Sequence, residues 1–493
     1  MSAYNKLVSH YNKISNFNHL SAIAGWDQAT MMPSGGHESR SKAMAELSLH
    51  IHKLSTSPDL GELFDKASSE ELTTVEQASL REMKRSWEMS TVIPEDLVEA
   101  KSLAGSNCEH AWRTQRSNND WEGFCKNFQS VVTLSKEEAQ IRAQKTGLTP
   151  YDSMLDIYEP GVNTEQLNNV FGDIKTWLPQ LTKDVQEKQN SENFIAPTEH
   201  FSTNEQKALG LEVMKLLGFD FNHGRLDISM HPFCGGVPQD TRITTRYDES
   251  DFVQSLMGIV HETGHARYEQ ALPAKFSGLP VGQARSMGIH ESQSLFFEMQ
   301  LGRNEEFINN LSILTKKHFP NNNPIVFEAS NLQKIYTRVN AGYIRVDADE
   351  LTYPAHVILR YEIERDLING KISFKDIPEL WNQKMLEYIG LSTQGNYKDG
   401  CMQDIHWCDG SFGYFPSYTL GAMYAAQFMA TIKKAIDVDD VLRSGDLTSI
   451  FSWLSDNIWS KGSLLSTDEL VKNATGETLN PKHFKEHLRS RYL

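Results

Sequence analysis

Cysteine is scarce in this chain of 493 residues: only five are present, and they are widely scattered. An odd number at irregular spacing does not suit the framework of a disulfide-stabilised secreted domain. The nearest pair, Cys401 and Cys408, also lacks the two-residue gap of a redox or zinc motif. Free thiols in a reducing compartment are therefore expected.

Long apolar runs and excess positive charge are missing as well. No run approaches 18 apolar residues, so no membrane span is predicted. The N-terminus has no basic segment followed by an apolar one, so we expect no signal peptide and a cytoplasmic location. The net charge of −16 argues against nucleic acid or an anionic membrane as the main partner.

Apolar residues recur every three or four positions through most of the chain, which predicts a mainly helical fold. The clearest helices are expected at residues 4–26, 38–54, 73–90, 94–117, 119–145 and 164–188, and the pattern returns after residue 325. Polar connections are expected at 189–206 and 318–324. Segments 225–233 and 240–247 are typical of strands, with "CGGVPQ" predicted as their connection.

The stretch "HETGH", His261 to His265, places two histidines four residues apart on a helix predicted to begin near Asp248 or Ser250 and to stop at Pro273. Residues at this spacing share one helix face, where two imidazoles can bind one metal ion. Glu262 points about 100° around the helix from His261, so it flanks the metal. That position suits a base acting on a water that the metal holds.

A catalytic zinc site needs a third protein ligand and leaves its fourth position to water. The next predicted helix offers His290, Glu291 and Glu298. Because Glu291 and Glu298 are seven residues apart, they fall near the same face, and spacing does not choose between them.

An ordered series of motifs resembles the carboxypeptidase Taq family of metallocarboxypeptidases, an HEXXH group that includes thermostable carboxypeptidase 1, from residue 26 to about 430. The motifs are "WDQATMMPSGG" (26–36), "HPF" (231–233), "DTRIT" (240–244), "HETGH" (261–265), "HESQS" (290–294), "IRVDAD" (344–349), "GCMQDIHW" (400–407) and "GYFPSYTLG" (413–421). Any one of them is a weak signal, whereas eight in order are specific.

The resemblance implies His261, His265 and Glu291 as metal ligands and Glu262 as general base. Glu298 is then interpreted as a carboxylate that orients a histidine ligand. It also implies one catalytic domain over residues 1–493, mainly helical, with two lobes around a deep groove, like neurolysin and angiotensin-converting enzyme. One zinc ion per chain, replaceable by cobalt, and a homodimer are expected on the same ground.

Peptide hydrolysis also needs a group that stabilises the oxyanion of the tetrahedral intermediate. The candidates are Tyr418, His406 and Tyr414, and we favour Tyr418, then His406. Core packing explains Tyr414 equally well.

A carboxypeptidase must recognise a free C-terminal carboxylate, for which the planar fork of arginine is suited. Arg345 and Arg242 are candidates, although each could form a structural ion pair instead. The family pattern favours Arg345 for the carboxylate, with Arg242 and His231 shaping the cleft.

The sequence therefore predicts a zinc carboxypeptidase that releases single residues, with broad specificity, from peptides with a free C-terminus. A peptidyl-dipeptidase or oligopeptidase of the same fold is the alternative among enzymes. A catalytically silent peptide-binding relative is the alternative outside them.

Overall fold

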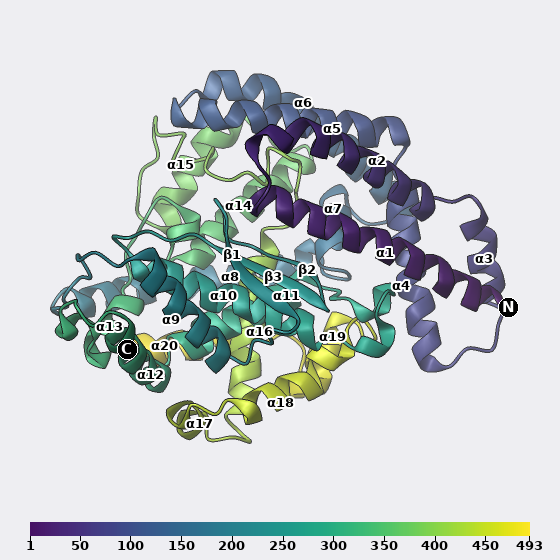
Figure 1. The fold of residues 1–493 in the computed structure, drawn as a ribbon. Coiled ribbons are helices and arrows are strands. Elements are labelled where there is room, and N and C mark those ends of the chain that lie inside the picture. The colour runs from purple at the N-terminus through teal and green to yellow at the C-terminus, as the bar shows by residue number, and fades with distance from the viewer.

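Helices form most of the molecule, as predicted. The computed structural model describes all 493 residues, with 20 α-helices and one small sheet (Figure 1). The helices before the sheet are α1 (Ala3–Thr30), α2 (His37–Ser55), α3 (Asp59–Ala67), α4 (Thr74–Thr91), α5 (Glu95–Ser117), α6 (Trp121–Thr146), α7 (Pro150–Tyr158), α8 (Thr164–Gln189) and α9 (Thr203–Leu216). No helix is both long enough and apolar enough to cross a lipid bilayer.

The helices after the sheet bring the later sequence motifs together. They are α10 (Phe252–Ala271), α11 (Met287–Leu295), α12 (Glu305–His318), α13 (Ala329–Tyr336), α14 (Tyr353–Ile368), α15 (Ile377–Tyr388), α16 (Pro416–Ile432), α17 (Val438–Ser444), α18 (Thr448–Asn457), α19 (Thr467–Thr475) and α20 (Lys482–Tyr492). In Figure 1, α10, α11 and α16 lie near the centre of the molecule, beside the sheet.

Local capping explains where several helices begin. The side chain of Thr73 accepts a hydrogen bond from the backbone of Glu76, and the Glu76 side chain accepts one from the backbone of Thr73, so α4 starts in a capping box. Asn163 and Gln166 do the same for α8. Ser202 caps α9, so the last residues of the predicted connection 189–206 lie in a helix.

The sheet has three strands in the order β1 (Gly224–Ile228), β3 (Asp240–Thr245), β2 (Cys234–Val237). β1 runs parallel to β3, and β2 runs antiparallel to it. The predicted connection "CGGVPQ" thus contributes the edge strand β2. Gly236 makes this possible: it adopts a φ of 95°, and a Cβ there would lie 2.1 Å from the carbonyl oxygen of Asp240.

Hydrophobic packing forms one main core and two satellites. The main core holds 80 buried residues and extends from α5 to α20. A second core of 12 residues lies among α1, α3 and α4 and includes Leu279 and Val281. A third, of six residues, lies beneath the sheet against α9 and α10. The single catalytic domain with two lobes stays a prediction.

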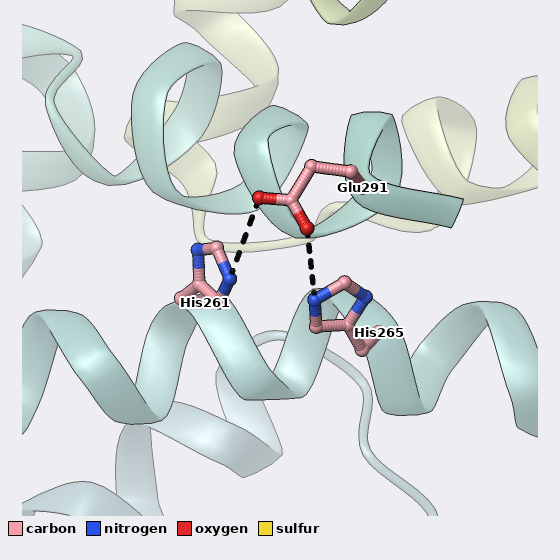
Figure 2. Close-up of side chains that lie close together, drawn as sticks. All are labelled: His261, His265 and Glu291. Atoms are coloured by element: carbon pink, nitrogen blue, oxygen red, sulfur yellow. Dashed lines mark ion pairs between the residues drawn. The ribbon is translucent and has the colours of Figure 1, made fainter. Parts of the chain in front are cut away.

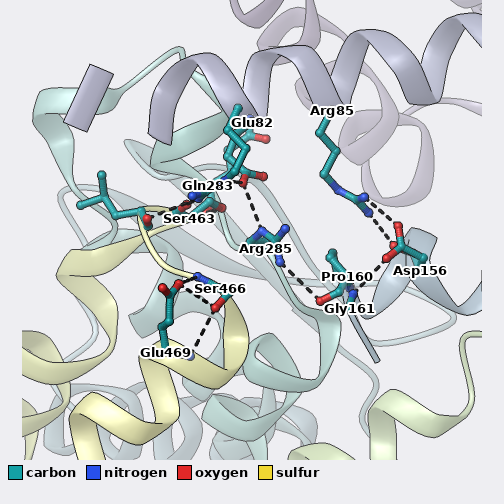
Figure 3. Close-up of polar contacts among 12 residues, drawn as sticks. Glu82, Arg85, Asp156, Pro160, Gly161, Gln283, Arg285, Ser463, Ser466 and Glu469 are labelled. Atoms are coloured by element: carbon teal, nitrogen blue, oxygen red, sulfur yellow. Dashed lines mark hydrogen bonds and ion pairs between the residues drawn. The ribbon is translucent and has the colours of Figure 1, made fainter. Parts of the chain in front are cut away.

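Charged side chains on α4 tie the N-terminal helices to the rest of the molecule (Figure 3). Arg85 forms an ion pair with Asp156 at the end of α7 (2.8 Å). The buried Glu82 pairs with Arg285, which lies two residues before the start of α11 (3.1 Å). The end of α7 and the segment before α11 are therefore anchored on the same N-terminal helix.

Candidate metal centre

The two histidines of "HETGH" lie one turn apart on α10, as the spacing predicts. α10 begins one residue after Asp251, whose side chain accepts hydrogen bonds from the amides of Val253 (2.8 Å) and Gln254 (3.3 Å). Asp251 therefore caps the helix in place of the predicted Asp248 or Ser250. Figure 2 shows both imidazoles pointing from α10 toward Glu291 on α11.

The two helices can approach because glycines stand at their contacts. A Cβ on Gly264, within "HETGH", would lie 2.5 Å from the carbonyl oxygen of Gln293 on α11. On the other side of α11, a Cβ on Gly421 of α16 would lie 2.8 Å from Cγ of Glu291. Glu291 is thus held between α10 and α16, and its carboxylate is confined to the site.

The three side chains have the geometry of a metal site. Nε2 of His265 lies 3.4 Å from one carboxylate oxygen of Glu291, and Nε2 of His261 lies 3.9 Å from the other. The three ligand atoms all lie within 4.8 Å of one another. Ligand atoms that each lie about 2.1 Å from a tetrahedral zinc ion are about 3.4 Å apart. The donor set and its spacing therefore fit one divalent ion.

Glu298 lies behind His261 and resolves the ambiguity that spacing left. Its Oε2 is 2.8 Å from Nδ1 of His261, and its Oε1 pairs with Arg303 at 2.6 Å. After α11 the backbone continues as a π-helical turn (Phe296–Gly302), which changes the rotation per residue before Glu298. Glu291 therefore faces the Nε2 atoms, whereas Glu298 holds the far side of one ring.

The second histidine is held differently. The ring of His290 stacks on that of His265, with centroids 4.6 Å apart and an interplanar angle of 27°. His290 is fixed by Glu269, whose carboxylate lies 2.8 Å from Nε2. Nδ1 of His265 is buried without a hydrogen-bond partner. Aromatic packing therefore orients the ring of His265, whereas a carboxylate orients the ring of His261.

Burial adjusts the titration of the groups around the site. It raises the pKa of Glu262 to about 7, with a further contribution from the charge of Glu291. It lowers the pKa of His265 to about 4. For His261, burial acts in the same direction, but the hydrogen bond to Glu298 and the neighbouring carboxylates outweigh it and raise the pKa to about 10. Metal binding at His261 must therefore displace a proton.

Tyr418 and His406 lie together, at the start of α16 and in the loop before it. Nε2 of His406 is 3.0 Å from the Tyr418 hydroxyl. Burial raises the pKa of Tyr418 well above its usual value and lowers that of His406 to about 4. The rings of Tyr414 and Tyr418 meet edge to face, with centroids 5.2 Å apart. Near neutral pH this pair therefore comprises a protonated hydroxyl and a neutral imidazole.

Arg345 is buried beside this pair. Its Nε pairs with Asp404 (2.9 Å), Nη1 donates to the hydroxyl of Tyr353 (2.8 Å), and its guanidinium lies 4.9 Å from the Tyr418 ring centroid. Asp404 also pairs with Arg360 (2.6 Å). Nη2 of Arg345 makes no hydrogen bond within the chain, which leaves one edge of the guanidinium for another acceptor.

The remaining two predicted residues lie on or beside the sheet. Arg242 forms a two-pronged pair with Asp240 and lies over the ring of Trp26, 4.2 Å from its centroid. His231 is exposed in the connection between β1 and β2. Neither side chain contacts the three ligands, so the structure does not gather them with the metal site.

Sequence reasoning missed several residues that support the site. Asp404 lies in "GCMQDIHW", two residues before His406, so the motif itself could have identified it. Arg303 and Tyr353 carry no such signal, because their contacts depend on the π-helical turn and on the packing of α14. The same holds for Glu159, a fully buried carboxylate at the end of α7.

The same architecture is found in known metallopeptidases. A sequence profile described as carboxypeptidase Taq (M32) metallopeptidase matches residues 6–492. Carboxypeptidase 1 of Bacillus subtilis is 35% identical over 97% of this chain and 96% of its own length. Thermostable carboxypeptidase 1 of Thermus thermophilus is 34% identical over 100% of this chain and 98% of its own length.

Solved structures agree in fold. Metallocarboxypeptidase 1 of Trypanosoma cruzi superposes with a TM-score of 0.97 and 46% identity over 99% of both chains. Pyrococcus furiosus carboxypeptidase gives a TM-score of 0.94 and 31% identity over 100% of this chain and 99% of its own. The chain therefore belongs to the carboxypeptidase Taq (M32) family and is a metallocarboxypeptidase.

Proposed function

We propose that this metallocarboxypeptidase releases single amino acids, with broad specificity, from peptides that carry a free C-terminal carboxylate. The observation that carries the proposal is the convergence of His261, His265 and Glu291, with Glu262 next to the first ligand on α10. The full-length matches are to proteins named carboxypeptidases.

His261, His265 and Glu291 would hold one divalent ion, zinc by the nitrogen and oxygen character of the donors, with cobalt as a substitute. When bound, such an ion polarises a carbonyl and lowers the pKa of water in its coordination shell. Glu298 and Arg303 hold the ring of His261 in the orientation that leaves Nε2 free for the ion.

Glu262 is the proposed general base. Its pKa near 7 allows it to take a proton from the attacking water and to return that proton to the leaving amine. Tyr418 is the proposed donor to the oxyanion, because burial keeps its hydroxyl protonated. The neutral imidazole of His406 holds that hydroxyl in place, or donates beside it.

Arg345 is the proposed partner of the substrate's terminal carboxylate. Asp404 compensates part of its charge and fixes the guanidinium plane, while Nη2 keeps its hydrogens for an incoming oxygen. Arg242 and His231 are proposed to shape the cleft farther along the peptide, from the sheet. A single catalytic domain over 1–493 and a homodimer complete the proposal.

Mass spectrometry of a peptide ladder after incubation with the zinc-loaded protein tests this function. We expect successive loss of single C-terminal residues and no reaction with the matching C-terminal amides. Glu262→Gln should retain its metal and lose turnover. Release of dipeptides or internal fragments would favour a peptidyl-dipeptidase or oligopeptidase, and binding without cleavage would favour a silent relative.

A further inference from the structure

The carboxylate of Glu159 lies where two helices of the site begin. Its Oε2 accepts a hydrogen bond from the hydroxyl of Ser286 (2.6 Å), which caps α11. Its Oε1 accepts one from the hydroxyl of Ser417 (2.7 Å), in the first turn of α16. The amide of Gly288, in the first turn of α11, also donates to Oε1. One fully buried carboxylate thus joins the N-termini of both helices.

The segment that carries Glu159 is itself held firmly on its other side (Figure 3). Arg85 on α4 pairs with Asp156, and the amide of Gly161 donates to the same carboxylate (2.9 Å). Arg285 donates to the carbonyl of Pro160 (3.4 Å). The backbone on both sides of Glu159 is therefore held in place. The Glu159 carboxylate consequently has a fixed position from which it can hold the two helices.

The two helices carry groups that must act on the same substrate bond. Glu291 lies one turn into α11, and Tyr418 directly follows Ser417 on α16. Between them the helices touch at glycine: a Cβ on Gly288 would lie 3.3 Å from Cβ of Leu420. The helices therefore pack closely there, and the way each is held at its first turn contributes to their relative position.

We propose that Glu159 is a positioning residue that sets the distance between the metal ligand Glu291 and the oxyanion donor Tyr418. This inference rests on the proposed roles of those two residues. A carboxylate is suited to the task, because helix N-termini present unpaired amides and a positive dipole end. A displacement of about 1 Å between reacting groups can lower a rate about a hundredfold.

Two serine substitutions test the contact of Glu159 with α16 and its contact with α11 separately. Ser417→Ala frees only α16, so we expect kcat to fall about fivefold while KM and the affinity for cobalt stay unchanged. Ser286→Ala removes the hydroxyl contact between Glu159 and α11 and leaves that of the Gly288 amide, so we expect cobalt affinity, measured by titration of the metal-free protein, to fall about fivefold. Glu159→Ala should show both losses, and Glu159→Gln should recover part of each.

Asp152→Ala is the matched control. Asp152 is a buried carboxylate on the same helix, α7, and it accepts hydrogen bonds from Thr149 (2.7 Å) and from the amide of Thr164 (2.7 Å). It therefore joins α7 to α8 and to no helix of the site. We expect both quantities to stay within about twofold of wild type.

Wild-type values for both serine variants would overturn the proposal, and so would equal losses in Asp152→Ala. If Glu159→Ala does not fold, the two serine variants decide. Failure of the wild-type protein to release single residues would instead refute the proposed function, and the cobalt titration of Ser286→Ala would still test the role of Glu159.

Discussion

At the scale of single residues, three glutamate carboxylates each have a separate position in the site. Glu291 faces the metal position, Glu298 faces the back of His261, and Glu262 stays apart from both as the proposed base. All three are glutamates, so their position and surroundings, more than their chemistry, distinguish their roles.

Glu298→Gln should weaken zinc binding about 10- to 100-fold, because the amide orients His261 less strongly than a carboxylate does. The measurement is competition for zinc against a chelator of known affinity. Glu212→Gln is the matched control, since Glu212 pairs with His318 (2.6 Å) between α9 and α12 and contacts none of the three candidate ligands. Equal affinities for wild type and Glu298→Gln would remove Glu298 from this role.

The rate should depend on pH through Glu262. Burial raises its pKa from 4.5 to about 7, and a metal cation acts in the opposite direction. Because the base must be ionised, kcat/KM should fall as pH falls, with a one-proton midpoint between about 4.5 and 7. The residual activity of Glu262→Gln should lack this limb. A wild-type rate that rises as pH falls through this range would contradict the assignment.

At the scale of secondary-structure elements, glycine at the helix contacts decides how closely the ligands meet. Gly421→Ala would place a Cβ 2.8 Å from Cγ of Glu291. We expect a loss of about 1–3 kcal/mol in the free energy of unfolding and weaker zinc binding, measured by urea denaturation and metal titration.

Gly172→Ala is the control for the Gly421 variant. Gly172 lies within α8, and a Cβ there would meet nothing within 4 Å. Alanine at that position should leave zinc binding unchanged and stabilise the helix by up to about 1 kcal/mol. Similar behaviour of the two variants would show that the contact between α16 and Glu291 is not tight.

Sequence predicts these elements unevenly, and the reasons are physical. Long amphipathic helices such as α6 and α8 were predicted to within a few residues, because their periodicity spans many turns. β2 was missed because its glycines resemble a turn. The π-helical turn that contains Glu298 leaves no periodic signal, so spacing alone placed both glutamates on one face.

At the scale of the whole molecule, the N-terminal helices form their own small core and meet the rest through α4 and through Trp26 of α1, which lies against Arg242 of the sheet. Arg285→Met removes the partner of Glu82 next to α11, leaving only Arg81 beside that buried carboxylate. We expect the free energy of unfolding to fall by about 1–3 kcal/mol, measured in urea on the metal-free protein.

Arg443→Met provides the comparison, since Arg443 pairs with Glu306 (2.6 Å) on the exposed surface. That change should alter the same free energy by no more than about 0.5 kcal/mol. Equal effects of the two substitutions would show that the contact between α4 and α11 contributes little to stability.

The sequence predicts the ligands of the candidate site better than it predicts the tertiary contacts that support them. Ordered motifs identified the family, and through it His261, His265 and Glu291, without any knowledge of three-dimensional contacts. Glu159 acts through contacts with segments far along the chain, and only coordinates bring such segments together. Arg303 lies five residues after Glu298, and their contact depends on the π-helical turn.

Anomalous diffraction at the zinc edge, from crystals of the zinc-loaded protein, tests the central claim most directly. We predict one strong peak per chain, about 2.0–2.2 Å from Nε2 of His261, Nε2 of His265 and a carboxylate oxygen of Glu291. A peak that lacks any of these three ligands, or none at this place in zinc-saturated protein, would contradict the account.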